Sequence, residues 1–335
     1  MAYVYLAFAP LVWGGAFIVG KVLVAEVDPL MVAWLRFVVA SGLFAAIGWW
    51  KARRGRATDP RGRGRVGDGP PGRWVYALLG LTGIFGYNLF FFCGLTYTTA
   101  TESSLIIASS PVVVALIGRI FLGERLSAPK AAGVALSTAG VVLVILGAVG
   151  AAAGGGEEVR AASRLLGDLL MLGGVLSWAA YSALGKRLLR QVSPLEATSR
   201  ASYWGTLFLS GAVVLRAAFA DAVGGVSGLA GGISTLAELE AAALAGVGYL
   251  SVVCTVLGFV AWYKGLSAVE VSGAAAFLNL VPVSTLVIAL LALGERPTWV
   301  QLAGGLLVVG GVTLVSVAGT AAAGRRPDAA WRRAS

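Results

Sequence analysis

Long apolar stretches separated by short polar segments dominate the pattern of this chain. Ten of them approach the length of about 20 helical residues that crosses the hydrocarbon core of a bilayer. They lie near residues 3–24, 29–50, 74–97, 102–121, 128–150, 164–187, 196–216, 238–263, 270–293 and 297–319. The pattern therefore predicts an all-α integral membrane protein with ten transmembrane helices.

Composition supports a lipid environment. Hydrophobic residues make up 58% of the 335 residues and charged residues 13%, whereas soluble domains carry about 25% charged residues. The first apolar stretch has no basic segment before it, so we expect an uncleaved span rather than a signal peptide. Cys93 and Cys254 lie in apolar stretches and are expected to be free thiols.

Two sets of residues recur at fixed offsets. Trp13, Gly20, Lys21 and Pro29 return 165 positions later as Trp178, Gly185, Lys186 and Pro194. Gly94, Pro111, Gly133 and Gly140 return 171 positions later as Gly265, Pro282, Gly304 and Gly311. Each copy holds five spans, an odd number, so the second copy enters the membrane from the opposite face.

The duplication predicts the organisation of the chain. We expect a first five-helix repeat at 1–150, a linker at 151–163, a second, inverted repeat at 164–319 and a cytoplasmic tail at 320–335. The Gly-rich stretch 217–237 occupies the place of the Arg-rich loop 51–73. It is therefore expected to be a loop or an interfacial segment rather than an eleventh span.

The distribution of charge predicts the orientation. The net charge is +10, and eight Lys and Arg residues lie between Lys51 and Arg73. With the N-terminus inside, 20 of the 26 Lys and Arg residues fall in cytoplasmic segments. This bias indicates a topology signal rather than a nucleic-acid site. We expect both termini in the cytoplasm and the protein in the inner membrane of a bacterium.

The two copies share features that resemble a known family. Each has a Trp in its first span, a Pro midway along its fourth and Gly-Glu-Arg at that helix's end, at 123–125 and 294–296. The chain resembles the drug/metabolite transporter superfamily, and within it the ten-helix EamA-type branch, over residues 3–319. The resemblance implies export of amino acids and related metabolites. It also implies a central cavity lined by the first, third, fourth, sixth, eighth and ninth helices, with the fifth and tenth at the sides.

Pro111 and Pro282 interrupt the fourth and ninth helices at matching places. Each proline removes a helical hydrogen bond and crowds the carbonyl four residues back, on Ile107 and Leu278. Such interruptions often mark a transporter's binding site, although a kink with internally satisfied carbonyls is the alternative. The polar side chains nearest these carbonyls are Ser109, Ser110 and Asn279.

Aromatic and amide side chains near the expected cavity are further candidates for substrate contact. A cavity with such groups suits a small, partly apolar zwitterion. These candidates are Trp13, Tyr87, Asn88, Trp178, Tyr181 and Asn279. Together with Ser109, Pro111 and Pro282 they form the predicted substrate cavity.

Arg36 lies about seven residues into its span, and Asp168 lies at shallower depth on the same side. The two are predicted to form a gate pair or a passive charge pair, and snorkelling of Arg36 to the headgroups is the alternative. Neither residue is at the membrane centre and the first helix has no acid. This favours facilitated transport over proton coupling.

Other acidic residues are expected to have structural roles. Thr99 with Glu102 and Ser267 with Glu270 have the spacing of helix capping boxes. Glu124 and Glu295 precede a new helix, whose free N–H groups a carboxylate can accept. Gly133 and Gly140, repeated as Gly304 and Gly311, predict close helix contact within one chain or between two.

These patterns predict an exporter of small metabolites, above all amino acids with apolar or aromatic side chains, that works by alternating access. The alternative is a multidrug, sugar or nucleotide-sugar carrier on the same fold, with proton coupling. The chain has no His and a single Asp within the predicted spans, which argues against a hydrolase or a metal-dependent enzyme. We expect no cofactor and no metal.

The charge bias predicts the accessibility of two loops. In a variant lacking Cys93 and Cys254, cysteines introduced at Arg61 and Arg326 should resist impermeant thiol reagents in intact cells, because both sites should face the cytoplasm. Permeabilised cells provide the control, in which both sites should label. Ready labelling in intact cells would overturn the orientation.

Overall fold

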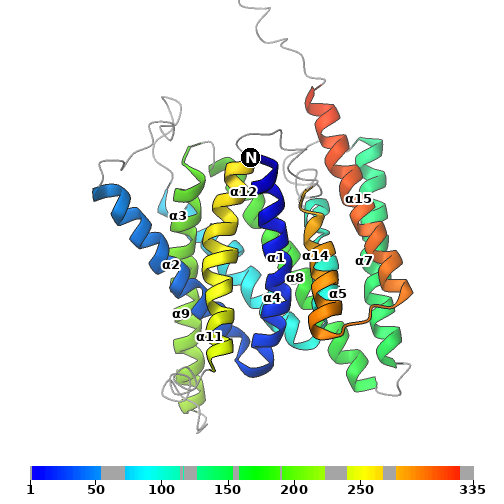
Figure 1. Cartoon of the computed structure of the whole chain (residues 1–335), viewed down its shortest axis with the longest axis horizontal. Coiled ribbons are helices and arrows are strands. Elements are labelled where there is room, and N and C mark those ends of the chain that lie inside the picture. Colours follow the sequence, from blue (N-terminus) through cyan, green and yellow to red (C-terminus); the bar gives the residue numbers. More distant parts are fainter. Residues whose placement is uncertain are drawn as a thin grey trace, which may run out of the picture.

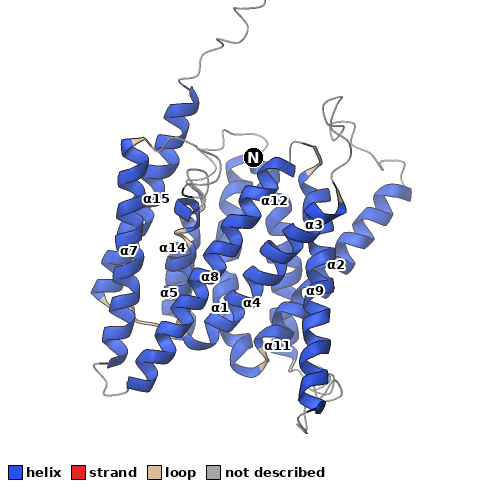
Figure 2. Ribbon diagram, turned by 180° about the vertical axis from the view of Figure 1, so that it is seen from behind, coloured by secondary structure: helices blue, strands red, loops and turns tan. Residues whose placement is uncertain are grey.

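The computed structural model of this chain describes residues 2–53, 72–113, 116, 127–153, 158–188, 191–222, 240–266 and 277–324. Within these ranges all regular secondary structure is helical, and the helices stand side by side as a bundle (Figures 1 and 2). The α-helices are α1 Ala2–Glu26, α2 Pro29–Arg53, α3 Arg73–Leu79, α4 Tyr87–Tyr97, α5 Ala100–Ile107, α7 Ala128–Ala153, α8 Glu158–Leu188, α9 Pro194–Ala222, α11 Ala241–Gly248, α12 Gly258–Leu266, α14 Leu280–Ile288 and α15 Trp299–Gly324. Three π-helical segments join some of them: η2 Gly80–Gly86, η3 Tyr249–Leu257 and η4 Ala289–Leu293.

Several helices have the length and composition of membrane spans. The six long apolar ones among the described residues are Tyr3–Glu26, Pro29–Arg53, Arg73–Tyr97, Ala128–Gly150, Ala161–Gly185 and Ala241–Trp262, and Leu280–Leu293 and Trp299–Val315 are shorter. Large apolar side chains point outward, and Phe219, Leu291 and Trp299 are each more than 70% exposed. Such surfaces are stable in lipid and costly in water. The chain is a multi-pass membrane protein.

Some helix boundaries differ from the sequence prediction. Helix α9 continues to Ala222, into the stretch 217–237 predicted as a loop, because the apolar pattern continues past Arg216. Helix α7 reaches Ala153 and α8 begins at Glu158, so both enter the predicted linker 151–163. Helix α15 extends to Gly324, into the predicted tail. Residues 54–71, most of the Arg-rich loop, lie outside the described residues.

The ends of the helices fix their relative directions. Lys21, near the end of α1, donates from Nζ to the carbonyl oxygens of Leu95 (2.6 Å) and Thr98 (2.7 Å) at the end of α4. Arg164, near the start of α8, pairs with Glu102 near the start of α5. The end of α1 and the start of α8 therefore lie at the same end of the bundle, and the two helices run in opposite directions. The predicted inverted repeat would require this relation between the first helices of its two copies.

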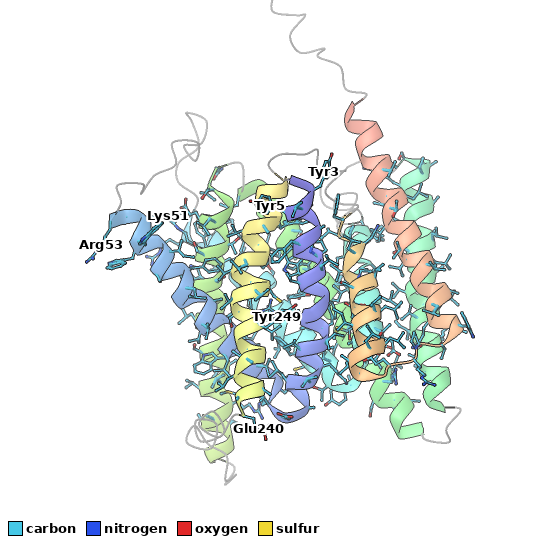
Figure 3. All side chains as sticks on the ribbon, in the orientation of Figure 1. Tyr3, Tyr5, Lys51, Arg53, Glu240 and Tyr249 are labelled. Carbon is cyan, nitrogen blue, oxygen red and sulfur yellow. The ribbon has the colours of Figure 1, made fainter. Side chains whose placement is uncertain are left out.

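The other end of the bundle carries the N-terminus. Tyr3, Lys51 and Arg53 lie towards that end and Glu240 lies at the opposite end (Figure 3). Tyr249 lies between them, and its hydroxyl donates to the carbonyl oxygen of Val12 at 2.7 Å. This bond ties η3 to the middle of α1, which also packs against α4, α5, α12 and α14.

Helices α7 and α15 pack against each other at one side of the bundle (Figure 1). A methyl group added at Gly140 would lie 2.6 Å from the carbonyl oxygen of Gly304, and one added at Gly133 would lie 2.7 Å from that of Gly311. Only glycine allows backbones so close. The contact predicted from the glycine spacing therefore forms within one chain.

This close approach predicts a selective effect of adding one carbon. Gly140→Ala should destabilise the protein by about 1–3 kcal/mol, because the α7 and α15 backbones must separate. Gly42→Ala in α2 is the matched control, since nothing lies within 4 Å of the added carbon. Thermal unfolding in detergent measures both variants. Equal midpoints for the two would contradict the packing described here.

Candidate functional site

Three of the four predicted cavity aromatics lie together. Tyr87 of α4 and Trp178 of α8 have ring centroids 5.2 Å apart, and Trp178 and Tyr181 are 5.3 Å apart. Phe91 stacks on Tyr87 at 5.7 Å. We call Tyr87, Trp178 and Tyr181 the aromatic cluster. It joins helices from the two sequence repeats.

Trp13 lies outside the aromatic cluster. Its Nε1 donates to the carbonyl oxygen of Cys254 at 2.9 Å, and its ring packs against Phe259 and Trp262 of α12. The repeat relates Trp13 to Trp178, yet the two rings have different neighbours. Trp13 therefore anchors α1 to the helix that contains η3.

The interruption before Pro111 is satisfied locally. Helix α5 ends at Ile107, and Ser110 Oγ donates to the Ile107 carbonyl at 2.5 Å. Ser109 Oγ donates to the Ile106 carbonyl at 2.6 Å. Of the two serines near the freed Ile107 carbonyl, Ser110 supplies its donor. This bond fits the kink alternative, because the freed carbonyl has a partner inside the helix.

The interruption before Pro282 is resolved differently. The Leu278 carbonyl accepts from the backbone N–H of Val281 at 3.0 Å, in a tight turn. Asn279 Nδ2 donates to Thr313 Oγ1 of α15 at 2.9 Å. Asn279, although near the Leu278 carbonyl in the sequence, does not donate to it, because its amide is turned towards α15.

Arg36 does not pair with Asp168, so the predicted gate pair is corrected. Arg36 is only 8% exposed, which also excludes snorkelling. Its Nε donates to Thr255 Oγ1 at 3.1 Å and its Nη1 to Asn88 Oδ1 at 3.2 Å. Asp168 instead lies 2.7 Å from Thr98 Oγ1. The prediction failed because depth in the membrane does not specify which helices are neighbours.

Glu102 is the centre of a second polar group. It is 1% exposed, and Arg164 binds both of its oxygens through Nε and Nη2, with Nε 2.9 Å from Oε2. Gln301 of α15 donates its amide to Oε1, and Thr98 Oγ1 lies 2.6 Å from Oε2. We call Thr98, Glu102, Arg164, Asp168 and Gln301 the Glu102 cluster. It joins four helical segments at the end of the bundle away from the N-terminus.

The hydroxyl of Thr98 contacts both buried carboxyl groups of the Glu102 cluster. A threonine hydroxyl has one hydrogen to donate. Its contacts of 2.6 Å with Glu102 and 2.7 Å with Asp168 are therefore both hydrogen bonds only if one carboxyl group is protonated. Glu102 has a cation and an amide as donors, whereas Asp168 is fully buried and its Oδ2 has no partner. Asp168 is the better place for the proton.

The sequence reasoning treated Glu102 as a helix cap and missed this cluster. The Glu102 backbone N–H does bond to Thr99 Oγ1 at 3.2 Å, as predicted, but the carboxylate turns away from the cap. Ser267, Glu270 and Glu124, in the other predicted caps, lie outside the described residues. The sequence contained one signal for the position of Gln301. Thr298 and Gln301 have the spacing of a capping box, and the box that they form fixes Gln301 at the start of α15.

Glu295 acts as a clasp between distant segments. Its carboxylate accepts from the backbone N–H groups of Ala100 (2.8 Å) and Thr101 (3.0 Å) at the start of α5. The carboxylate accepts from the free N–H groups of a helix start, as predicted, but that helix is α5 rather than the helix that follows Glu295. A cavity of about 210 Å³ lies beside it. Its lining residues are Thr99, Thr101, Glu102, Arg164, Glu295, Arg296, Pro297 and Gln301.

Relatives of this chain are transporters. A protein of Archaeoglobus fulgidus named "Uncharacterized transporter" is 34% identical over 94% of this chain and 96% of its own length. A "Probable amino-acid metabolite efflux pump" of Salmonella typhimurium is 29% identical over 90% of both chains. A "Probable terminal-alkyne amino-acid exporter" of Streptantibioticus cattleyicolor is 30% identical over 72% of both.

A solved structure and a family profile also match this chain. A solved crystal structure, 18% identical in sequence, superposes with a TM-score of 0.60 over 95% of this chain and 98% of its own, and so shares the fold. The profile of the EamA-like transporter family matches residues 1–146 and 165–317. The chain therefore belongs to the EamA-like transporter family.

Proposed function

We propose that this protein exports small metabolites, namely amino acids and preferentially those with apolar or aromatic side chains, from the bacterial cytoplasm. Ten spans in two inverted repeats, residues 1–150 and 164–319, would alternate access to a central site with both termini in the cytoplasm. The two stretches that match the family profile support the duplication. The names of relatives in Salmonella and Streptantibioticus support the substrate class.

The observation that carries the proposal is the aromatic cluster beside a buried guanidinium. Tyr87 and Trp178 bring rings from both repeats into contact, and Asn88, the residue after Tyr87 in α4, accepts from Arg36 Nη1 at 3.2 Å. Rings accommodate an apolar side chain, and a cation attracts a carboxylate. Together these groups match the apolar side chain and the carboxylate of an amino acid.

The Glu102 cluster is suited to closing one end of the pathway. Its bonds connect the end of α4 and the starts of α5, α8 and α15, and Lys21 ties α1 to the same place. In the proposed orientation this end faces outward. The structure would then represent a state closed to the outside, and export would require these bonds to break.

We propose that transport is facilitated. Asp168 would keep its proton in the closed state, where a neutral carboxyl can donate to Thr98 while Thr98 donates to Glu102. The proton would then stabilise the cluster instead of travelling with the substrate. Kinks before Pro111 and Pro282 would let the fourth and ninth helices bend as the pathway opens.

An uptake screen tests the substrate class. Purified protein in liposomes, offered labelled amino acids, sugars and organic cations separately, should equilibrate amino acids faster than protein-free liposomes. L-phenylalanine and L-leucine should be among the better substrates, because the site combines rings with a cation. Transport of only sugars or only organic cations would instead favour the alternative carriers.

Substitutions in the Glu102 cluster test the coupling. Asp168→Asn should retain transport of L-phenylalanine without an imposed pH gradient, because an amide also donates to Thr98. Glu102→Gln should lower stability by about 1–3 kcal/mol, because Arg164 loses its anionic partner. Transport rates and thermal midpoints measure the two effects. Uphill accumulation driven by a proton gradient, and lost in Asp168→Asn, is the result that would refute facilitated transport.

A further inference from the structure

Arg36 is a buried charge inside a membrane span. It lies seven residues into α2, on the order of 10 Å along the helix axis, and its side chain is 8% exposed. Arginine at such depth is costly and usually has a function or an anionic partner. A charge buried in this way therefore calls for an anionic partner.

The described part of the chain supplies no anion to Arg36. Its two hydrogen-bond acceptors, Thr255 Oγ1 and Asn88 Oδ1, are neutral. Three acidic residues of the described chain have other partners: Asp28 with Arg216, Glu102 with Arg164, and Asp168 with Thr98. A buried guanidinium held only by neutral groups keeps most of its positive potential.

Both acceptors are held in position by unusual helical geometry. Thr255 lies in η3, and its hydroxyl donates to the Leu250 carbonyl, five residues back, at 2.8 Å. Asn88 follows η2, and its Nδ2 donates to the Ile84 carbonyl at 2.8 Å. With their donors occupied, both side chains present an oxygen to Arg36. Single π-helical segments inside α-helices are frequent at functional sites.

The second repeat shows that the helix contact does not need an arginine. The offset of 165 that relates Pro29 to Pro194, the first residues of α2 and α9, relates Arg36 to Ala201. Ala201 is fully buried, and its carbonyl oxygen lies 2.9 Å from a methyl group placed on Gly80 of η2. Helix α9 therefore packs on η2 with an alanine at this position. Helix α2 packs on η3 in the same way, but with Arg36 at the equivalent position. The charge is an addition to a packing arrangement that works without it.

The Arg36 guanidinium has more N–H donors than these two bonds use. Nε and Nη1 each make one bond, and Nη2 makes none to the residues that the structure describes. Nη1 and Nη2 together can present two parallel N–H groups to a carboxylate.

We propose that Arg36 binds the carboxylate of the transported amino acid. This inference rests on the proposed function and names the residue that recognises the polar end of the substrate. Asn88 and Thr255 orient the guanidinium, and the aromatic cluster, which begins at the neighbouring Tyr87, receives the side chain. A compound that lacks the carboxylate should be a poor ligand.

Transport kinetics in proteoliposomes test the assignment. The probe is labelled L-phenylalanine, and the competitor is phenethylamine, which has the same ring and amine without the carboxylate. Phenethylamine should compete poorly in the wild type. In Arg36→Gln, KM for L-phenylalanine should rise about tenfold or more, and the preference for L-phenylalanine over phenethylamine should disappear.

Two further variants separate recognition from general effects. Arg36→Lys keeps the charge but not the paired N–H groups, so its KM should lie between those of the wild type and Arg36→Gln. Arg200→Gln is the matched control, because Arg200 is exposed and pairs with Glu196 in the next turn of α9. It should leave KM and the preference unchanged. If Arg36→Gln does not fold, the raised KM of Arg36→Lys provides the test.

The outcomes distinguish this inference from the function on which it rests. If the wild type transports none of the screened amino acids, the proposed function fails and the inference fails with it. If the wild type transports L-phenylalanine and a folded Arg36→Gln does so with unchanged KM and preference, the assignment of Arg36 alone is overturned. Thermal unfolding of each variant in detergent establishes that it is folded.

Discussion

A polar group inside a hydrocarbon layer has no water to bond with, and this constraint organises the structure. The buried charged residues Arg36 and Glu102 find their partners on helices distant in the sequence. Arg36 of α2 reaches α4 and η3, and Glu102 of α5 reaches α8 and α15. Since an unpaired group would cost several kcal/mol in such a medium, these bonds select which helices are neighbours.

Apolar packing contributes in a different way. Lipid chains are as apolar as leucine, so burial of apolar side chains gives little reason for helices to associate. Helices α7 and α15 instead associate through backbones brought into contact at Gly133, Gly140, Gly304 and Gly311. The long apolar faces that remain, such as those at Leu291 and Leu306, meet lipid. The bundle therefore combines a few polar bonds with close glycine contacts.

The two polar groups have contrasting designs that suit different roles. The Glu102 cluster balances a carboxylate against an arginine and an amide and ties four helical segments at one end. Such a balanced group stabilises one arrangement of helix ends and is suited to a gate. Arg36, near the aromatic cluster, has only neutral partners in the described part of the chain. An unbalanced cation is suited to attracting an anionic ligand, because the charge is already desolvated and oriented.

The sequence by itself determined the class of protein. The length of the apolar stretches, the recurrence of Trp13 and Pro29 at one offset and the Gly spacing depend on local periodicity, which a single sequence displays directly. The same reasoning placed the kink before Pro111 and its serine donors, because those bonds span only three residues. It also placed Tyr87, Trp178 and Tyr181 in one region.

Only the tertiary structure decided the partners of the charged residues. The expected pair of Arg36 and Asp168 does not form, Asn279 faces α15, and Glu102 is the centre of a cluster rather than a cap. Each of these bonds joins residues between 34 and 219 positions apart. Residue depth along a helix can be read from a sequence, but the rotation of each helix and the identity of its neighbour cannot. Both depend on the polar bonds and the close glycine contacts that form between distant helices in the folded bundle.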